Sequence, residues 1–221
     1  VGNLKAQYCI PDYTIGTGDG DYIDGVVLGD ISNFSGMGDE YNDYTDLSTL
    51  LNPGSTYDLE VYNTPSWPEN YAAWIDWNQN QTFDASEKVA LTPDANRLVF
   101  TGIVTVPAGA LPGNTRLRAR LMYTGTVSPC GNATYGEVED YTVTVLAADQ
   151  GACCAATGAC SISTAAACGT GFQGAATTCS PSNPCGGACC NGATCTVSTA
   201  ATCPSGSIFV NHRVCDANAC T

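Results

Sequence analysis

Six side chains that carry oxygen lie at regular spacing in one short segment, residues 76–87. Counted from the first residue of that segment, they occupy positions 1, 3, 5, 7, 9 and 12: Asp76, Asn78, Asn80, Thr82, Asp84 and Glu87. This is the ligand spacing of a calcium loop, in which a hard cation needs about six to eight converging oxygens. Two features depart from that loop, because Gln81 occupies the glycine position and the flanking residues resemble strands. The spacing predicts a Ca²⁺ site, and an Asx-rich turn without a metal is the alternative.

A second group of acids enters the last strand-like segment of the first half of the chain: Glu137, Glu139 and Asp140. If Tyr141 faces the core, the strand period places Glu137 and Glu139 on that same side. Buried carboxylates need a partner, because an unpaired buried charge is very costly. The candidates are a bound cation and three arginines of another segment, Arg116, Arg118 and Arg120. Paired acids also suggest glycoside hydrolysis, but these acids lie on one strand, so we predict a structural acid cluster.

Other catalytic and binding arrangements lack the residues that they need. His212 is the only histidine and lies among cysteines, so we expect no catalytic triad. No glycine-rich phosphate loop occurs. The chain carries 7 basic and 21 acidic residues, a formal charge of −14, which excludes a typical nucleic-acid-binding protein. No apolar run reaches the roughly 18 residues of a membrane span. We therefore expect a protein that is not an enzyme.

The segments that would position these side chains have the pattern of short strands. Turn residues separate six such segments: residues 24–29, 56–62, 72–77, 98–106, 116–121 and 141–145. In residues 116–121, for example, Leu117, Ala119 and Leu121 alternate with the three arginines. Period-two segments at this spacing are typical of an antiparallel β-sandwich. We predict an all-β chain whose residues 1–147 form that sandwich.

The distribution of cysteine predicts two further domains, residues 148–186 and 187–221. They form a tandem repeat of six cysteines each: Cys153, Cys154, Cys160, Cys168, Cys179 and Cys185, then Cys189, Cys190, Cys195, Cys203, Cys215 and Cys220. Modules this small need disulfides for stability, and disulfides form in oxidising compartments. Zinc is the weaker alternative, because no CxxC motif is present. We predict two small disulfide-rich modules in an extracellular or cell-surface protein, with the pairing within each repeat left open.

Residues 8–146 resemble the GEVED domain of secreted bacterial proteins. The resemblance rests on short motifs spread over this range: Tyr8 and Cys9, residues 21–23, residues 41–45, residues 74–78, Phe83 and Asp84 with Glu87, residues 115–118, residues 129–131 and residues 136–141. It implies a β-sandwich of extracellular or cell-surface proteins without an established catalytic activity. The family usually has an Asp-Gly type of turn after Asp76, from which Asn80 and Gln81 depart. Cys9 and Cys130 are the only cysteines of this domain, and we expect them to pair.

Two functions follow as hypotheses. The first is a structural protein that self-associates into a surface fibre or filament, with residues 1–8 added as a strand to a neighbour's sheet. The second is a secreted calcium-dependent adhesion module that binds carbohydrate or a surface. For the second, Trp67, Trp74 and Trp77 would form a platform for sugar rings, and their alternative is a place in the core. Because the chain begins at Val1, we expect a processed form or a fragment of a longer protein.

Overall fold

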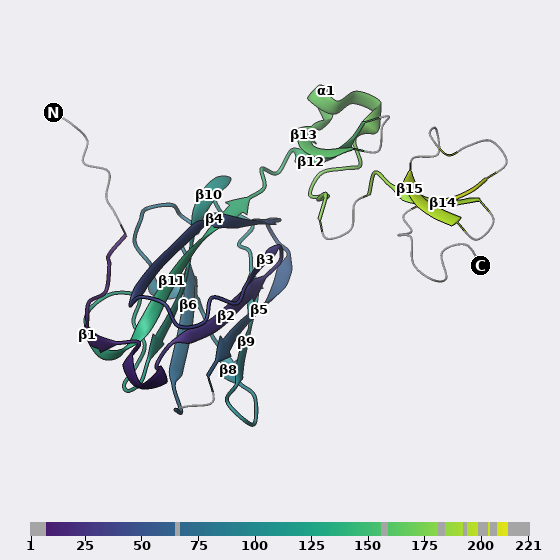
Figure 1. The fold of residues 1–221 in the computed structure, drawn as a ribbon. Helices are drawn as coiled ribbons and strands as arrows, with labels where there is room; N and C mark the ends of the chain where they lie inside the picture. Colours follow the sequence, from purple (N-terminus) through teal and green to yellow (C-terminus); the bar gives the residue numbers. More distant parts are fainter. Residues whose placement is uncertain are drawn as a thin grey trace. The chain divides into compact units, whose positions relative to one another are not determined.

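The computed structural model describes residues 8–64, 67–155, 159–180, 184–191, 194–198, 203 and 207–211. The chain divides into two compact units, Val1–Val145 and Leu146–Thr221. Strands dominate the described residues of both units, so the prediction of an all-β chain is confirmed (Figure 1). None of the described helices is both long and apolar enough to cross a membrane.

Two sheets form the first unit (Figure 1). One sheet has the order β1-β11-β10-β6-β7, and β4 also pairs with β11; its strands are β1 (Tyr13–Gly16), β4 (Tyr41–Leu51), β6 (Asn70–Ile75), β7 (Lys88–Val89), β10 (Gly113–Met122) and β11 (Ala133–Val145). The other has the order β3-β2-β5-β9-β8; its strands are β2 (Ile23–Leu28), β3 (Ile31–Asn33), β5 (Thr56–Asn63), β8 (Thr92–Pro93) and β9 (Val99–Thr105). Two short 3₁₀ helices interrupt the loops, η1 (Gly18–Gly20) and η2 (Ala85–Glu87).

The strands pair antiparallel, as predicted, with two exceptions. Both β1 and β4 run parallel to β11. The register of β4 shifts between Tyr141 and Thr142 of β11, so the long strand is irregular near its middle. Alternation of apolar residues identifies a strand but does not fix the direction of its neighbour, and for that reason the sequence did not predict these parallel pairs.

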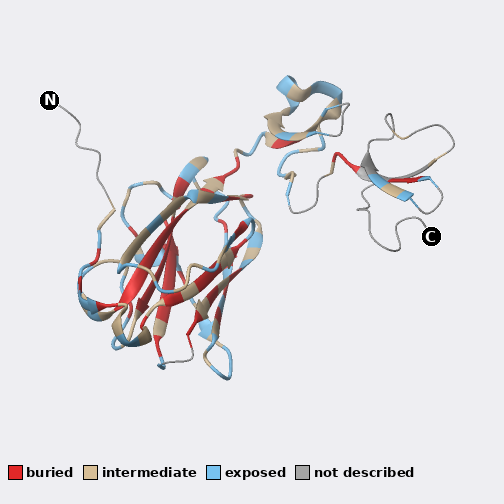
Figure 2. Ribbon diagram, in the orientation of Figure 1, coloured by how far each residue is buried: buried red, intermediate tan, exposed pale blue. Residues whose placement is uncertain are grey.

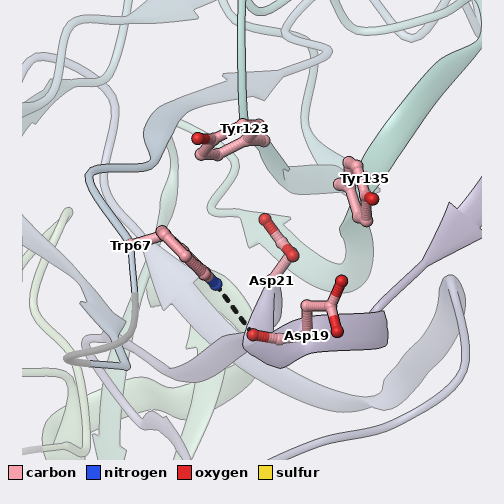
Figure 3. Close-up of a pocket in the computed structure, with 5 residues that line it drawn as sticks. All are labelled: Asp19, Asp21, Trp67, Tyr123 and Tyr135. Atoms are coloured by element: carbon pink, nitrogen blue, oxygen red, sulfur yellow. Dashed lines mark hydrogen bonds between the residues drawn. The ribbon is translucent and has the colours of Figure 1, made fainter.

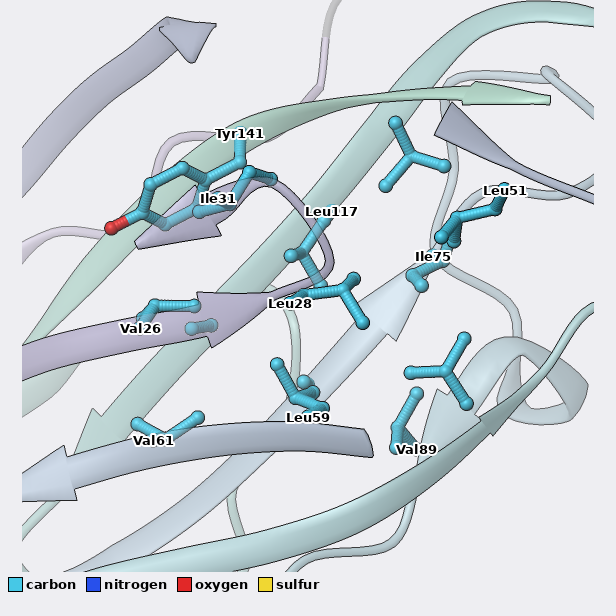
Figure 4. Close-up of a cluster of buried hydrophobic side chains, with 14 of the residues drawn as sticks. Val26, Leu28, Ile31, Leu51, Leu59, Val61, Ile75, Val89, Leu117 and Tyr141 are labelled. Atoms are coloured by element: carbon cyan, nitrogen blue, oxygen red, sulfur yellow. The ribbon is translucent and has the colours of Figure 1, made fainter. Parts of the chain in front are cut away.

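The main core lies between the two sheets. Leu117, Ala119 and Leu121 of β10 are fully buried there. Leu28 and Leu59 of the opposite sheet are also fully buried and lie near Leu117 (Figure 4). Figure 2 shows the buried residues concentrated along the strands of this unit. Each large aliphatic side chain buried in this way contributes about 1.5–3 kcal/mol. The core thus depends on the period-two pattern of both sheets.

The opposite face of the first sheet is also covered, which explains its buried arginines. Arg118 and Arg120 are fully buried on this face. A second apolar cluster covers it, made of Ala72, Trp74, Phe83 and Val127 with Tyr8 and Met122 against them. The predicted disulfide between Cys9 and Cys130 is present. It joins two segments that cover this face, one containing Tyr8 and the other containing Val127, across 121 residues of sequence. In the chain-entropy view, a loop of that length gives the bond a stabilising effect of about 4–5 kcal/mol.

The second unit begins with a hairpin, β12 (Gln150–Cys154) and β13 (Cys160–Thr164), followed by α1 (Ala165–Cys168) and η3 (Gly169–Gly171). Its described disulfides join Cys153 to Cys168, Cys154 to Cys185 and Cys160 to Cys179. The second repeat contains β14 (Gly187–Asn191), β15 (Thr194–Ser198) and β16 (Ile208–Asn211). Its Cys189–Cys203 bridge matches Cys153–Cys168 of the first repeat. Cys190 and Cys195 are also disulfide-bonded, whereas Cys215, Cys220 and His212 lie outside the described residues.

Candidate functional site

The predicted calcium loop follows directly after buried strand β6. Its first residue, Asp76, is fully buried, and its carboxylate organises the turn that follows. The backbone N–H groups of Asn80 and Gln81 donate to this carboxylate at 3.2 and 2.9 Å. The Tyr8 hydroxyl donates to the Asp76 carboxylate at 2.6 Å. This bond links the loop to the segment around Tyr8 that covers the first sheet.

Gln81 adopts the backbone conformation that a calcium loop requires at its sixth position. Its φ is +65°, in the left-handed region, where such loops carry glycine for a sharp turn. Gln79 has a φ of +53° and is also left-handed. A residue with a Cβ pays about 1–2 kcal/mol for this conformation. The loop therefore makes the turn with glutamine at that position, and the bonds of Asp76 hold it.

The other predicted oxygens surround the same turn. The side-chain oxygens of Asn78 and Asn80 accept from the N–H groups of Asn80 and Thr82 at 3.0 and 2.7 Å. Both asparagine amides donate to Asp84 Oδ2, at 3.0 and 3.3 Å. The side chains of Asn78, Asn80 and Asp84 are thus in contact with one another, whereas Thr82 is exposed.

Glu87 closes the loop through hydrogen bonds to the backbone. Its Oε1 accepts from the N–H groups of Trp77 and Asn78 at 2.9 and 3.3 Å, and its Oε2 accepts from Asp84 N–H at 2.9 Å. In the described parts of the chain, no group of three or more His, Cys, Asp or Glu side chains is arranged to hold a metal ion. A cation in this loop would therefore depend on the amide oxygens of Asn78 and Asn80 together with Asp76 and Asp84.

Glu137 and Glu139 of the acid cluster face the main core, as predicted, and both are fully buried. Glu137 accepts from the N–H of Ile23 at 2.6 Å and from the Asn42 amide at 2.5 Å. Glu139 accepts from the hydroxyls of Ser35 at 2.6 Å and Tyr141 at 2.7 Å. The suggested pairing of these two glutamates with arginines is wrong, because alternation along β10 places the arginines on the opposite face of the sheet.

Burial changes the titration of both glutamates. It raises the pKa of Glu137 to about 9, with a further contribution from the negative charge of Glu139. It raises the pKa of Glu139 to about 7, against the opposing effect of the Ser35 and Tyr141 hydroxyls. Both glutamates therefore bind protons more tightly in the folded protein than in the unfolded chain.

Asp140 is the member of the acid cluster that pairs with arginine. Arg118 binds it with two nitrogens, Nε and Nη2, both at 2.8 Å, and Arg116 Nη1 binds it at 2.8 Å. Arg120 instead donates to the backbone carbonyls of Ser128 and Cys130, at 2.8 and 2.9 Å, in the second of the segments that cover this face. Arg118 and Arg120 thus hold residues 128–131 on the sheet.

A pocket of about 240 Å³ lies elsewhere in the first unit, and the sequence analysis did not identify it. Its lining residues are Asp19, Asp21, Trp67, Tyr123 and Tyr135 (Figure 3). The Trp67 and Tyr123 rings meet edge to face at 6.1 Å, and the Tyr123 and Tyr135 rings at 6.0 Å. The Trp67 indole N–H donates to the Asp19 carbonyl at 2.8 Å.

The three tryptophans do not form a common platform. Trp74 and Trp77 are buried, whereas 46 % of Trp67 is exposed. The hypothesis of a sugar platform made of all three is therefore wrong. Among the pocket residues, the sequence pointed only to Trp67 as a binding residue, and Asp21 appeared only within a family motif. The segments that carry Asp21, Tyr123 and Tyr135 come together only in the folded domain.

Comparisons with known proteins agree with this description of the first unit. A comparison with curated proteins found no match. The family model of the GEVED domain matches residues 70–144. This range contains the loop after Asp76, the arginines of β10 and the acid cluster of β11. Residues 70–144 of the first unit are therefore similar to the GEVED domain.

Proposed function

We propose that this chain is a non-catalytic structural subunit of an extracellular fibre, and that one edge of its first sheet accepts a strand from a neighbouring subunit. The cysteines of the described residues are all in disulfides, which fits an extracellular, disulfide-stabilised protein. The buried acids of the acid cluster, Glu137, Glu139 and Asp140, form hydrogen bonds and ion pairs within the domain. This supports a role that depends on a stable domain rather than on catalysis.

The observation that carries the proposal is the edge strand β4. It extends over 11 residues, Tyr41–Leu51, or about 36 Å at the usual rise. It pairs with β11 on one side, and in the described part of the chain no strand pairs with its other side. A long unpaired edge is a template for another strand, and proteins either protect such an edge or use it for assembly.

The proposed donor is the N-terminal segment of a neighbour. Residues 1–7 lie outside the described residues, so the structure does not test this prediction. Tyr8 belongs to the domain itself, because its ring stacks on Phe83 at 5.0 Å and its hydroxyl bonds to Asp76. Cys9 is fixed by its disulfide. A donated strand would therefore consist of residues 1–7, one residue shorter than the sequence suggested.

A proline placed on the outer side of β4 tests the proposal. The N–H of Val138 donates to the Glu40 carbonyl at 2.9 Å, so the backbone groups of Glu40 point toward β11. Because these groups alternate along a strand, the N–H of Asp43 points away from β11. Asp43→Pro removes that outer donor and leaves the pairing with β11 in place. Asp43→Ala is the matched control, since it loses the same carboxylate but keeps the N–H.

Electron microscopy of negatively stained protein gives the readout. We expect filaments from the native chain and from Asp43→Ala, and dispersed folded particles from Asp43→Pro. Circular dichroism would check that both variants keep the native fold. Filaments of unchanged length and number in a folded Asp43→Pro variant would refute the role of β4.

The second candidate function is a calcium-dependent adhesion module. The left-handed turn at Gln81 favours it, because the turn places Asp76, Asn78, Asn80 and Asp84 around one loop. In this case bound Ca²⁺ would stabilise the loop for contact with a carbohydrate or another surface. Fibre formation without any effect of calcium would favour the first function over this one.

A further inference from the structure

Two carboxyl groups, those of Asp21 and Glu69, interact beside the pocket that contains Trp67, and in the described residues neither forms an ion pair. Glu69 is fully buried, and neither of its carboxylate oxygens receives a hydrogen bond from any N–H group of the described residues. Its carboxyl group interacts with that of Asp21, which is 2 % exposed. Two carboxyl groups in contact must share a proton, since two adjacent buried negative charges repel each other strongly.

Arg97 acts on this pair only partly: its charge lowers the pKa of Glu69, but it forms no ion pair with either carboxyl group. Arg97 donates through Nη2 to the backbone carbonyl of Glu69, and its guanidinium lies over the Phe100 ring, 5.2 Å from the ring centre. Its Nε has no partner among the described residues. Arg97 thus offsets at most one negative charge, and a second ionised carboxyl group in the Asp21–Glu69 pair would lack a cation.

Of the two acids, Asp21 lines the pocket, together with three aromatic side chains. The Asp21 side chain lies in the space between the rings of Trp67, Tyr123 and Tyr135 (Figure 3). Both tyrosines are half-buried, and Asp19 is exposed at the rim. No lysine or arginine is among the residues that line the pocket. An entering group thus meets aromatic rings first and a buried carboxyl group behind them.

We propose that this pocket binds the ammonium group of an alkylamine, with the charge at the Asp21–Glu69 pair and the carbon chain against the three rings. Aromatic rings attract cations, and buried carboxylates require one. A neutral sugar would stack on the rings but leave the acid pair without a positive charge. A metal ion would need more oxygens, and no group of three acids in the described residues is arranged to hold one. The inference is independent of the fibre proposal.

Binding should expel the proton that the two acids share. The ammonium supplies the positive charge that the proton supplied, so Asp21 and Glu69 are both ionised in the complex and about one proton passes to the solvent. Burial and the contact with Asp21 raise the pKa of Glu69 to about 8 in the free protein. The other charged or titratable groups facing the pair are Asp19, Arg97 and the Tyr71 hydroxyl. Affinity should therefore rise between pH 6 and pH 8, by about tenfold or more.

The indole N–H of Trp67 provides a direct probe of this pocket. Nuclear magnetic resonance of ¹⁵N-labelled native protein would follow this signal, assigned with Trp67→Phe, during titration with n-butylammonium chloride. The matched neutral ligand is n-butanol, and sodium chloride controls for ionic strength. We expect a saturable shift with n-butylammonium only. Equal shifts with n-butanol or with sodium chloride would overturn the proposal.

Two isosteric variants separate the roles of the acids. Asp21→Asn removes the carboxylate that faces the ligand and should weaken binding at pH 8 by about tenfold or more. Glu69→Gln keeps Asp21 ionised at both pH values, because the new amide donates to it, so binding should persist but lose its pH dependence. Asp46→Asn, an exposed change on β4, should alter neither. Unchanged affinity in Asp21→Asn, or unchanged pH dependence in Glu69→Gln, would refute the assignment.

A titration with a second ammonium compound distinguishes the source of the amine. N-acetyl-lysine-methylamide presents the same ammonium group on a blocked amino acid. Binding of this compound as well as n-butylammonium would indicate a lysine side chain of a protein partner. Binding of n-butylammonium alone would indicate a free small amine.

Discussion

Replacement of Glu139 by glutamine should make the first unit more stable at alkaline pH. The glutamine has the same shape, and the neighbouring hydroxyls can adjust to it. Tyr141 can still donate to the side-chain oxygen, and the new amide can donate to Ser35 Oγ. Ser35 then turns its hydroxyl to the Ile23 carbonyl, which lies 3.5 Å away. The substitution thus removes a buried charge and keeps both hydrogen bonds.

The size of the effect follows from the pKa of Glu139. This pKa is about 7 in the folded protein, against an ordinary value of 4.5. Between these values Glu139 binds more protons in the folded state than in the unfolded state. Its own contribution to the free energy of unfolding therefore falls as pH rises from 4.5 to 7 and stays constant above. The difference corresponds to about 3 kcal/mol at pH 8.5 and to less than about 0.5 kcal/mol at pH 4.5. Glu139→Gln should recover that amount, and more where it also relieves the repulsion of Glu137.

Urea unfolding at pH 4.5, 7 and 8.5, with disulfides intact and tryptophan fluorescence as the signal, measures this difference. Glu40→Gln, an exposed change of the same kind, is the control and should leave the pH profile unchanged. We expect the native protein to lose stability toward pH 8.5. Glu139→Gln should lose about 3 kcal/mol less, because Glu137 still titrates in both proteins. A variant that is destabilised equally at all three pH values would refute the reasoning, because it would show that the ionised carboxylate is the stabilising form.

Two further predictions concern the loop and the arginine face. Ca²⁺ should raise the melting temperature relative to a chelator, since a ligand bound only to the native state stabilises it, and Asn80→Ala should abolish this rise; equal melting temperatures of the native protein would contradict a calcium site. Asp140→Ala should lower the free energy of unfolding by about 3–5 kcal/mol, because it leaves the buried Arg118 without its anion. The exposed control Asp46→Asn should change the free energy of unfolding by about 0.5 kcal/mol or less in the same urea titration. An equally small effect of Asp140→Ala would contradict the structural role of the Arg118–Asp140 pair.

Local patterns predicted the parts of this molecule that depend on neighbouring residues in sequence. The alternation of Leu117, Ala119 and Leu121 identified β10 and its core face, because a strand repeats every two residues. The spacing of Asp76, Asn78 and Asn80 identified a loop whose turn is formed by its own side chains. The cysteine repeat and the Cys9–Cys130 pair followed from counting alone.

Features that depend on distant segments were not predictable in this way. The distant partners of Glu137 and Glu139 come from β2, from β4 and from the chain between β3 and β4. No local pattern marks Ser35 or Asn42 for this role. The parallel pairing of β4 depends on the path of the chain between the sheets. The pocket unites Asp21, Trp67 and Tyr123, which lie far apart in sequence, so it exists only after folding.

Electron microscopy of the native, unreduced protein, negatively stained at high concentration, tests the central claim most directly. Assembly through the β4 edge predicts regular filaments whose repeat is a few nanometres, the size of one subunit. It also predicts that Asp43→Ala preserves them. Dispersed particles at every concentration, both with calcium and with chelator, would contradict the account of this chain as a fibre subunit.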